Sequence, residues 1–166
     1  MLTRCFRPAL CALTLTALCG TAMATATTST RSVSTATASQ LALETVAACS
    51  AEGYNVSAAV VDRSGVLLSL VRADGAGPHT VQASISKAFT SASSRNPTSG
   101  IAKAVQSNPD AAGMTDIPGF LVLAGGVPIK VGNETLGAIG VAGAPGGHLD
   151  EACAQKALAT IATTLK

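Results

Sequence analysis

Residues 120–151, FLVLAGGVPIKVGNETLGAIGVAGAPGGHLDE, decide the fold of this chain. Apolar and polar residues alternate from Val127 to Val131, and this period of two is typical of a half-buried strand. The pair Gly132-Asn133 then predicts a two-residue hairpin turn with glycine in the first position. The next apolar run, Leu136 to Val141, is interrupted by glycines, which inside a strand mark a close approach of another group. The stretch therefore predicts two or three strands joined by tight turns.

The glycine-rich loop from Ala144 to Gly147 ends these strands, and Asp150 is placed to cap the helix that follows. A glycine-rich loop before a helix is also an arrangement that binds phosphate. The sequence has neither the Gly-Lys-Ser/Thr ending of a P-loop nor the GxGxxG pattern of dinucleotide sites. Asp150 and Glu151 would also repel a phosphate at this helix end. We therefore interpret the loop as a structural turn from strand to helix.

The N-terminal segment, residues 1–24, has the pattern of a secretory signal peptide. Arg4 and Arg7 give a basic start, an apolar run follows from about Pro8 to Leu18, and Ala22-Met23-Ala24 offers a cleavage site for signal peptidase. The apolar run is too short to span a bilayer. We therefore predict an exported protein that resides in the periplasm or outside the cell.

The charge of the mature chain excludes one class of partner. Removal of the signal segment takes two of the 11 Lys and Arg residues and none of the 9 Asp and Glu residues, so the formal net charge falls to zero. A balanced chain gives no electrostatic reason to expect binding to nucleic acid or to an anionic membrane. We expect a small-molecule ligand and partner proteins instead.

The composition of the mature chain points to a core of small aliphatic side chains. Tyr54, Phe89 and Phe120 are the only aromatic residues that remain after cleavage. Because small apolar side chains bury little area each, we expect that association of subunits supplies part of the burial. A homo-oligomer is therefore predicted.

Cys49 and Cys153 are the two cysteines that remain after cleavage. An oxidising compartment favours a disulfide between them, which would close a loop of about a hundred residues and stabilise the fold by roughly 4 kcal/mol in the chain-entropy model. The alternative is two buried thiols on packed helices. Neither cysteine has the CxxC or CxxH neighbour that a metal site would need.

The rest of the chain predicts one α+β domain over residues 38–166, preceded by a flexible Thr/Ser/Ala-rich arm at 25–37. The tight connections between strands favour an antiparallel sheet with helices on one or both faces. In the helix expected from Thr80 to about Ser93, the apolar residues recur on one side, which we expect to be buried, and the polar side lies opposite. The expected buried residues are Val81, Ile85, Ala88 and Ala92, and the expected polar side has Ala83, Lys87, Thr90 and Ser94. The other expected helices cover about 38–52, about 98–105 and the chain from 150, and the expected strands cover 56–61, 66–72 and three segments between 120 and 141.

His79 and His148 are the only histidines, and each lies in a Gly/Pro-rich loop at the start of a helix. Imidazole ligates haem iron and titrates near neutrality, so these residues are the first candidates for handling haem, a metal or a proton. The alternative is that both are solvated loop residues. Met114 and Tyr54 are the other candidate iron ligands.

Basic residues near these loops are candidates for binding a carboxylate, either a haem propionate or a small acid. They are Arg72, Lys87 and Arg95, and the alternative for Arg72 is an ordinary ion pair with Asp74. The sequence has no GxSxG motif and no Ser/His/Asp spacing that marks an activated nucleophile. We assign no catalytic residue.

Four stretches in this order resemble the GlcG/HbpS-type haem-binding family, over about residues 40–165. The resemblance implies a profilin-like α+β domain with a five-stranded antiparallel sheet flanked by helices. It also implies haem binding, linked in some members to haem degradation or redox sensing, and assembly into higher homo-oligomers, with an octamer as one candidate. The stretches are VVDRSGVLLSLVRADGAGPHT (60–80), SKAFTSASSRNPTS (86–99), DIPGFLVLAGGVPI (116–129) and GAIGVAGAPGGHLDEACA (137–154).

The resemblance also implies a ligand-binding neighbourhood. His79 and His148 lie within its matched motifs, and their imidazoles are our candidate ligands of haem iron. Two hypotheses follow. The first is an exported haem-binding protein for sensing, storage or scavenging, without turnover of its own and with a membrane sensor as a candidate partner. The second is a protein or enzyme that binds a small hydroxy acid through Lys87 and Arg72. The neighbourhood comprises Arg72, Asp74, His79, Lys87, Thr98 and His148.

Overall fold

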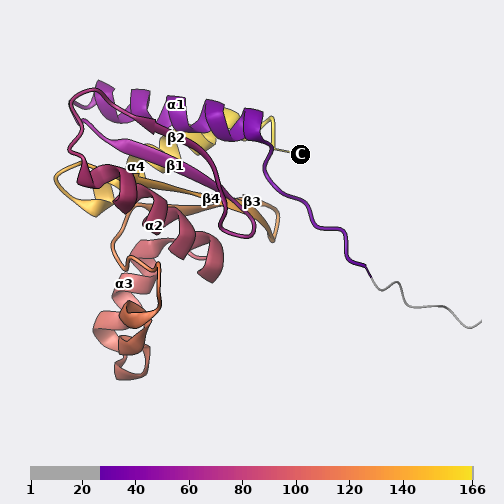
Figure 1. Ribbon diagram of the computed structural model, residues 1–166, viewed down its shortest axis with the longest axis vertical. Coiled ribbons are helices and arrows are strands. Elements are labelled where there is room, and N and C mark those ends of the chain that lie inside the picture. The colour runs from indigo at the N-terminus through magenta and orange to yellow at the C-terminus, as the bar shows by residue number, and fades with distance from the viewer. Residues whose placement is uncertain (1–26, 166) are drawn as a thin grey trace, which may run out of the picture.

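The computed structural model describes residues 27–165, so the predicted signal peptide lies outside the described residues. Figure 1 shows an antiparallel sheet of four strands with helices on both of its faces, which confirms the α+β class. The strand order in the sheet is β2-β1-β4-β3. The strands are β1 (Ser57–Asp62), β2 (Leu67–Arg72), β3 (Gly126–Val131) and β4 (Glu134–Ala142).

Two helices cover one face of the sheet and a third covers the other. The larger core joins α1 and α4 to one face, and α2 packs on the opposite face. The helix α3 and the short helix η1 extend away from the sheet below α2 (Figure 1). Within residues 27–165, no helix is long and apolar enough to cross a membrane. The helices are α1 (Thr35–Ala51), α2 (His79–Ser94), α3 (Thr98–Ser107), η1 (Pro109–Asp116) and α4 (Gly147–Ile161).

The expected fifth strand does not form, so the five-stranded sheet is a wrong prediction. The apolar segment 120–124 runs past α2 instead of joining the sheet. The Leu121 N–H donates to Oγ1 of Thr90 over 2.8 Å, and the Leu123 N–H donates to the Leu121 carbonyl over 2.9 Å. Because a helix hydroxyl and a local turn satisfy these N–H groups, no ladder partner is needed.

The hairpin between β3 and β4 is confirmed. Val131 ends β3 and Glu134 begins β4, so Gly132-Asn133 is the whole loop. Gly132 has a φ of 58°, the left-handed value that glycine adopts without steric cost. The first position of a type II′ turn requires a positive φ of this kind.

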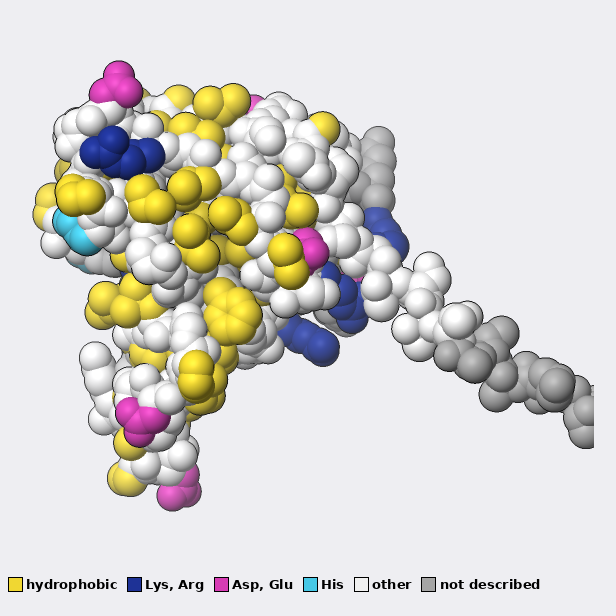
Figure 2. Space-filling view, in the orientation of Figure 1, with side chains coloured by type: hydrophobic (Ala, Val, Ile, Leu, Met, Phe, Trp, Pro, Cys, Tyr) yellow, Lys and Arg dark blue, Asp and Glu magenta, His cyan; other side chains and the backbone are white. Residues whose placement is uncertain are grey.

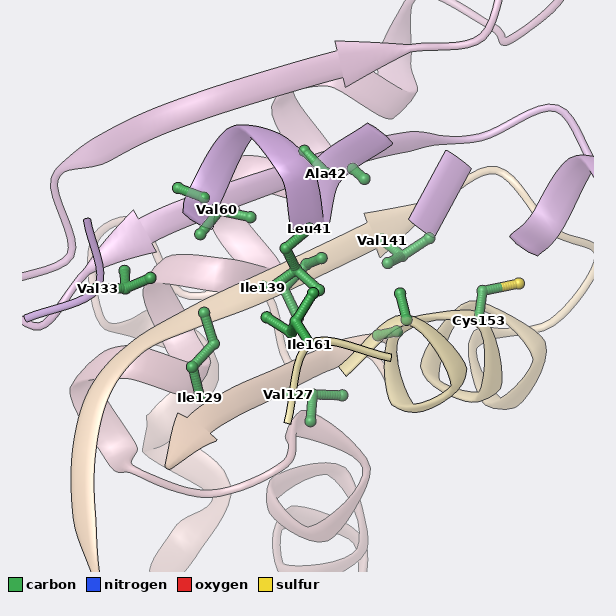
Figure 3. Packing of buried hydrophobic residues seen from close by; sticks show 14 of the residues in the cluster. Val33, Leu41, Ala42, Val60, Val127, Ile129, Ile139, Val141, Cys153 and Ile161 are labelled. Carbon is green, nitrogen blue, oxygen red and sulfur yellow. The ribbon is translucent and has the colours of Figure 1, made fainter. Parts of the chain in front are cut away.

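The larger core lies between the sheet and the helices α1 and α4 (Figure 3). Leu41 of α1 and Ile161 of α4 meet Ile139 of β4 there, and all three are fully buried. A disulfide joins Cys49 of α1 to Cys153 of α4, with 5.4 Å between the two Cα atoms. The predicted pairing is therefore present, and it fixes the two helices of this layer to each other.

The helix α1 begins at Thr35, earlier than the expected start near residue 38. Ser34 caps it, since its hydroxyl accepts the Thr37 N–H over 3.2 Å. Val33 is only 6% exposed, and its N–H donates to the Leu136 carbonyl over 3.0 Å. The C-terminal part of the expected arm is thus packed against β4 or included in α1.

The expected buried side of α2 is confirmed at Ala88 and Ala92 but not at the larger side chains. Lys87 and Thr90 are buried, whereas Val81 and Ile85 are only partly covered. The reason is a close approach of α2 to β4, because a Cβ on Gly140 would lie 2.1 Å from the Ser84 carbonyl oxygen. Only small side chains fit such a contact, so the larger apolar ones lie at its margin.

Hydrophobic side chains consequently gather on the α2 and β2 side of the molecule (Figure 2). Val66 is 61% exposed and Leu67 is 42% exposed, and Val81 and Ile85 of α2 are only partly covered. Exposed apolar surface of this kind is a feature of faces that bind another protein.

The contact at Gly140 predicts a large penalty for any side chain. Gly140→Ala should lower the free energy of unfolding by about 3 kcal/mol or more, because the methyl group overlaps helix backbone that cannot move alone. The matched control is Gly100→Ala, at a helical glycine with open space around it. This control should be neutral or stabilising by up to about 1 kcal/mol. Urea denaturation of both variants measures the difference, and equal stabilities would contradict the close packing.

The disulfide predicts a redox-dependent stability. The Cys49→Ala/Cys153→Ala variant should lose about 2–4 kcal/mol in urea denaturation, because the unfolded chain regains the freedom of a loop with a sequence separation of 104. Dithiothreitol should destabilise the unmodified chain by a similar amount and leave the double variant unchanged. Two titratable thiols in the oxidised native protein would show that the bridge is absent.

Candidate functional site

A cavity of about 830 Å³ lies between α2, α3, α4 and the glycine-rich loop 143–147. This volume falls within the range of about 300–1,000 Å³ that is usual for ligand sites. Each helix contributes one face, since its lining residues recur at spacings of three or four. They are His79, Ala83 and Lys87 of α2, Ser99, Ala102, Lys103 and Gln106 of α3, and His148, Asp150, Glu151, Ala152 and Gln155 of α4.

The remaining wall of the cavity is mostly apolar. It comes from the segment 122–124, which passes by α2, and from residues 142–147 at the end of β4. The segment that was expected to form a fifth strand therefore belongs to the site, because Val122 and Leu123 line the cavity. An apolar wall beside a few polar groups is the usual character of a small-molecule site.

The two histidines reach this cavity by the same local geometry. Each lies two residues after a glycine, in Gly77-Pro78-His79 and in Gly146-Gly147-His148. A Cβ on either glycine would lie 2.7 Å from Cε1 of the following imidazole. Each ring thus rests on a glycine backbone, and Nε2 is its more distant nitrogen, at 3.9 Å for His79 and 3.8 Å for His148. Both rings are exposed and line the same cavity.

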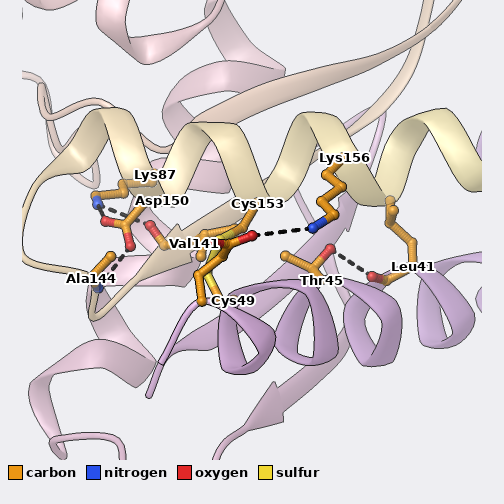
Figure 4. Close-up of a disulfide and its surroundings, with 10 residues drawn as sticks. Leu41, Thr45, Cys49, Lys87, Val141, Ala144, Asp150, Cys153 and Lys156 are labelled. Carbon is orange, nitrogen blue, oxygen red and sulfur yellow. Dashed lines mark hydrogen bonds and ion pairs between the residues drawn. A yellow bond between two sulfur atoms is a disulfide. The ribbon is translucent and has the colours of Figure 1, made fainter. Parts of the chain in front are cut away.

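A buried ion pair forms the inner end of the cavity (Figure 4). Lys87 Nζ lies 2.7 Å from Oδ2 of Asp150 and donates to the Val141 carbonyl over 2.9 Å. The other carboxylate oxygen, Oδ1, accepts the Ala144 N–H over 3.0 Å. Lys87 is 4% exposed and Asp150 is 2% exposed. The pair joins α2, the end of β4, the loop and the first turn of α4.

Burial raises the pKa of the Asp150 carboxyl above its usual value. The hydrogen bond and charge of Lys87, the Ala144 N–H and the charge of His148 all lower that pKa and oppose the effect of burial.

Asp150 is not the helix cap that the sequence predicts. The N-cap position of α4 is Gly146, and Asp150 turns inward to Lys87 because the ammonium has no other carboxylate partner among the described residues.

A second polar contact ties α3 to α4 at the wall of the cavity. Ser99 Oγ donates to Oε1 of Glu151 over 2.9 Å, and Gln155 Nε2 lies 3.5 Å from the same oxygen. The other oxygen, Oε2, is buried and has no hydrogen-bond partner in the described part of the chain. Glu151 therefore gives this part of the wall a negative character.

The structure brings together three of the six predicted site residues, His79, Lys87 and His148. The other three lie outside the cavity lining. Arg72 donates to the Ala76 carbonyl, Asp74 is exposed in a turn, and Thr98 is fully buried. Thr98 Oγ1 accepts the Gly126 N–H over 2.8 Å and so anchors the start of α3 to β3.

The two other candidate iron ligands also lie elsewhere. Tyr54 packs against the larger core and Met114 belongs to η1, and neither lines the cavity. The sequence prediction missed the contribution of α3, which supplies Lys103 and Gln106. The helical spacing of these residues is readable in the sequence, but the fold of α3 over the cavity is not.

Comparison with known proteins identifies the family. Residues 33–159 match the family described as "Haem degrading protein HbpS-like". The chain belongs to this family. Protein GlcG of Escherichia coli strain K12 is 38% identical over 88 residues, which are 53% of this chain and 64% of GlcG. The match thus spans less than two thirds of the length of GlcG.

Two solved structures share the fold over most of the chain. A double mutant of HbpS from Streptomyces reticuli is 41% identical with a TM-score of 0.77, and the match covers 81% of this chain and 90% of that one. Protein ORFY of Klebsiella pneumoniae is 26% identical with a TM-score of 0.79, covering 84% and 97%. The match to the family at the level of sequence confirms the resemblance predicted above.

The ion pair at the inner end of the cavity predicts a pH-dependent loss of stability. Lys87→Met leaves the Asp150 carboxylate buried without its counter-ion, which should cost about 3–5 kcal/mol at pH 7. Without the ammonium, the pKa of Asp150 rises further above its unfolded value. The native state then binds a proton more tightly than the unfolded state, so the loss should shrink as the pH falls through that pKa.

Urea denaturation between pH 7 and pH 4 measures this effect. The matched control is Lys130→Met, which changes an exposed lysine of β3 and should stay within about 0.5 kcal/mol of the unmodified chain. A Lys87→Met variant as stable as this control at pH 7 would contradict the buried pair.

Proposed function

We propose that this chain is an exported haem-binding protein whose haem lies in the cavity between α2, α3 and α4, with the imidazoles of His79 and His148 as iron ligands. One observation carries the proposal: the only two histidines of the sequence come from distant positions to the same cavity. Membership of the HbpS-like family gives independent support.

The donor set suits haem better than a bare metal ion. Among the described residues, no group of three or more His, Cys, Asp or Glu side chains is arranged to hold a metal ion. Haem iron already has its four porphyrin nitrogens, so one or two protein ligands are sufficient. Two imidazoles on one cavity meet that need and do not meet the need of a free cation.

The residues of the cavity have separate tasks in this account. The iron of bound haem supplies ligand-binding and electron-transfer chemistry. His79 and His148 hold the iron, while Val122 and Leu123 offer apolar surface to the macrocycle. Lys87 and Asp150 fix the first turn of α4 and thereby the position of His148. No residue of the cavity is assigned to turnover, and we propose binding rather than catalysis.

The alternative ligand, a small hydroxy acid, has less support from the geometry. That hypothesis needs Lys87 and Arg72 to hold one carboxylate. Arg72 lies outside the cavity, and Asp150 already neutralises the Lys87 ammonium. We therefore favour haem over a small acid.

Export, a sensing or storage role and oligomer formation belong to the same proposal. The signal-like pattern at residues 1–24 supports export. The exposed apolar side chains Val66 and Leu67 support association with further copies of the chain. A membrane sensor is the candidate partner in a sensing role.

A hemin titration of the chain from Thr25, followed in the Soret region, tests the proposal. Hemin should bind saturably and shift the Soret band. His79→Ala and His148→Ala should each change the band and weaken binding, because each removes one iron ligand, and the double variant should lose the shift. The control is Gln82→Ala, an exposed α2 residue outside the cavity lining, which should bind as the unmodified chain does.

A spectrum that stays that of free hemin would overturn the proposal. Saturable binding that is unaffected by both histidine variants would place haem elsewhere on the chain. Circular dichroism of each variant separates loss of binding from loss of fold.

A further inference from the structure

We propose that Lys103 and Gln106 of α3 form a carboxylate subsite that sets the orientation of an apolar carboxylic acid in the cavity, and haem with its propionates belongs to this class. The inference rests on the proposed function and extends it from the iron to the acidic edge of the ligand. It follows from the uneven distribution of charge along the cavity wall.

Lys103 is the one lining cation that has no acidic partner among the described residues. Apart from the histidines, the lining has four charged side chains, and two of them neutralise each other at the inner end. Glu151 is engaged by Ser99 through a 2.9 Å hydrogen bond. Lys103 is exposed, and no ion pair involves it within residues 27–165. Its ammonium is therefore available to an anionic group of a ligand.

The wall formed by α3 and α4 changes character along its length. Ser99, with Glu151 opposite, lies in the first turn of α3, and Lys103 lies one turn further along the same face. Gln106 continues that face toward the end of the helix. One end of the wall is thus acidic, and the other offers an ammonium and a carboxamide.

The acidic end repels a carboxylate more strongly than an exposed residue would. Oε2 of Glu151 is buried and receives no hydrogen bond from the described residues. A carboxylate charge with little solvent around it acts over a longer range than one in water. A ligand carboxylate consequently has one favourable position on this wall, beside Lys103 and away from Glu151.

Apolar residues that line the same cavity do not fix a direction by themselves. Ala102, Ala152 and Leu123 offer no hydrogen bond from their side chains. The ligand class that fits is a molecule with a large apolar body and a carboxylate at one edge. Orientation then depends on the charge difference between Lys103 and Glu151.

Hemin and its dimethyl ester, titrated in one buffer with a mild detergent, test the subsite because the ester keeps the iron and lacks the carboxylates. Lys103→Glu should weaken hemin binding about tenfold and Lys103→Gln about threefold, the range of a partly exposed ion pair and its reversal. Binding of the ester should change less than twofold in either variant. The matched control, Lys130→Glu, reverses an exposed lysine of β3 outside this cavity and should leave both ligands unaffected.

The outcomes separate this inference from the haem proposal. Hemin affinity that is equal in the unmodified chain and in Lys103→Glu would overturn the subsite while haem binding stands. Equal weakening of hemin and ester would also overturn it, because the variant would then act on packing and not on the carboxylates. Failure of the unmodified chain to bind either ligand would overturn the haem proposal itself.

Discussion

The buried ion pair between Lys87 and Asp150 is the interaction on which the site depends. Its 2.7 Å contact joins a helix on one face of the sheet to the first turn of a helix on the other face. Two further hydrogen bonds, to the Val141 carbonyl and from the Ala144 N–H, include the strand end and the loop. Because breaking a buried pair leaves an uncompensated charge, the four segments keep one arrangement. That arrangement places the two histidines on one cavity.

Glycine makes this arrangement sterically accessible. Gly126 meets the backbone of α2, since a Cβ there would lie 2.4 Å from the Lys87 carbonyl oxygen. Gly125 lies directly beside the ion pair, where a Cβ would lie 2.9 Å from Lys87 Nζ. These two glycines therefore let the helix approach the sheet. Val81 and Ile85 are displaced to the margin by the same constraint.

The sequence allows prediction of local structure better than of the site. Alternation and turn chemistry predict β3, β4 and their hairpin, and the pair Cys49 and Cys153 predicts the bridge between α1 and α4. The same rules assign segment 120–124 to a strand and Asp150 to a cap, because periodicity does not reveal a partner distant in sequence. Thr90 Oγ1 accepts the Leu121 N–H of that segment, and the Lys87 ammonium pairs with the Asp150 carboxylate. Of the six residues of the predicted neighbourhood, only His79 and Lys87 of α2 and His148 of α4 line the cavity.

The proposed role of His79 and His148 as ligands of haem iron can be tested by locating the iron in a crystal of the hemin complex. Iron scatters anomalously, so a difference map locates it independently of the shape of the ligand density. The account predicts one iron peak per chain in the cavity between α2, α3 and α4, within bonding distance of imidazole nitrogen. A peak outside this cavity, or one in the cavity ligated by neither histidine, would contradict it.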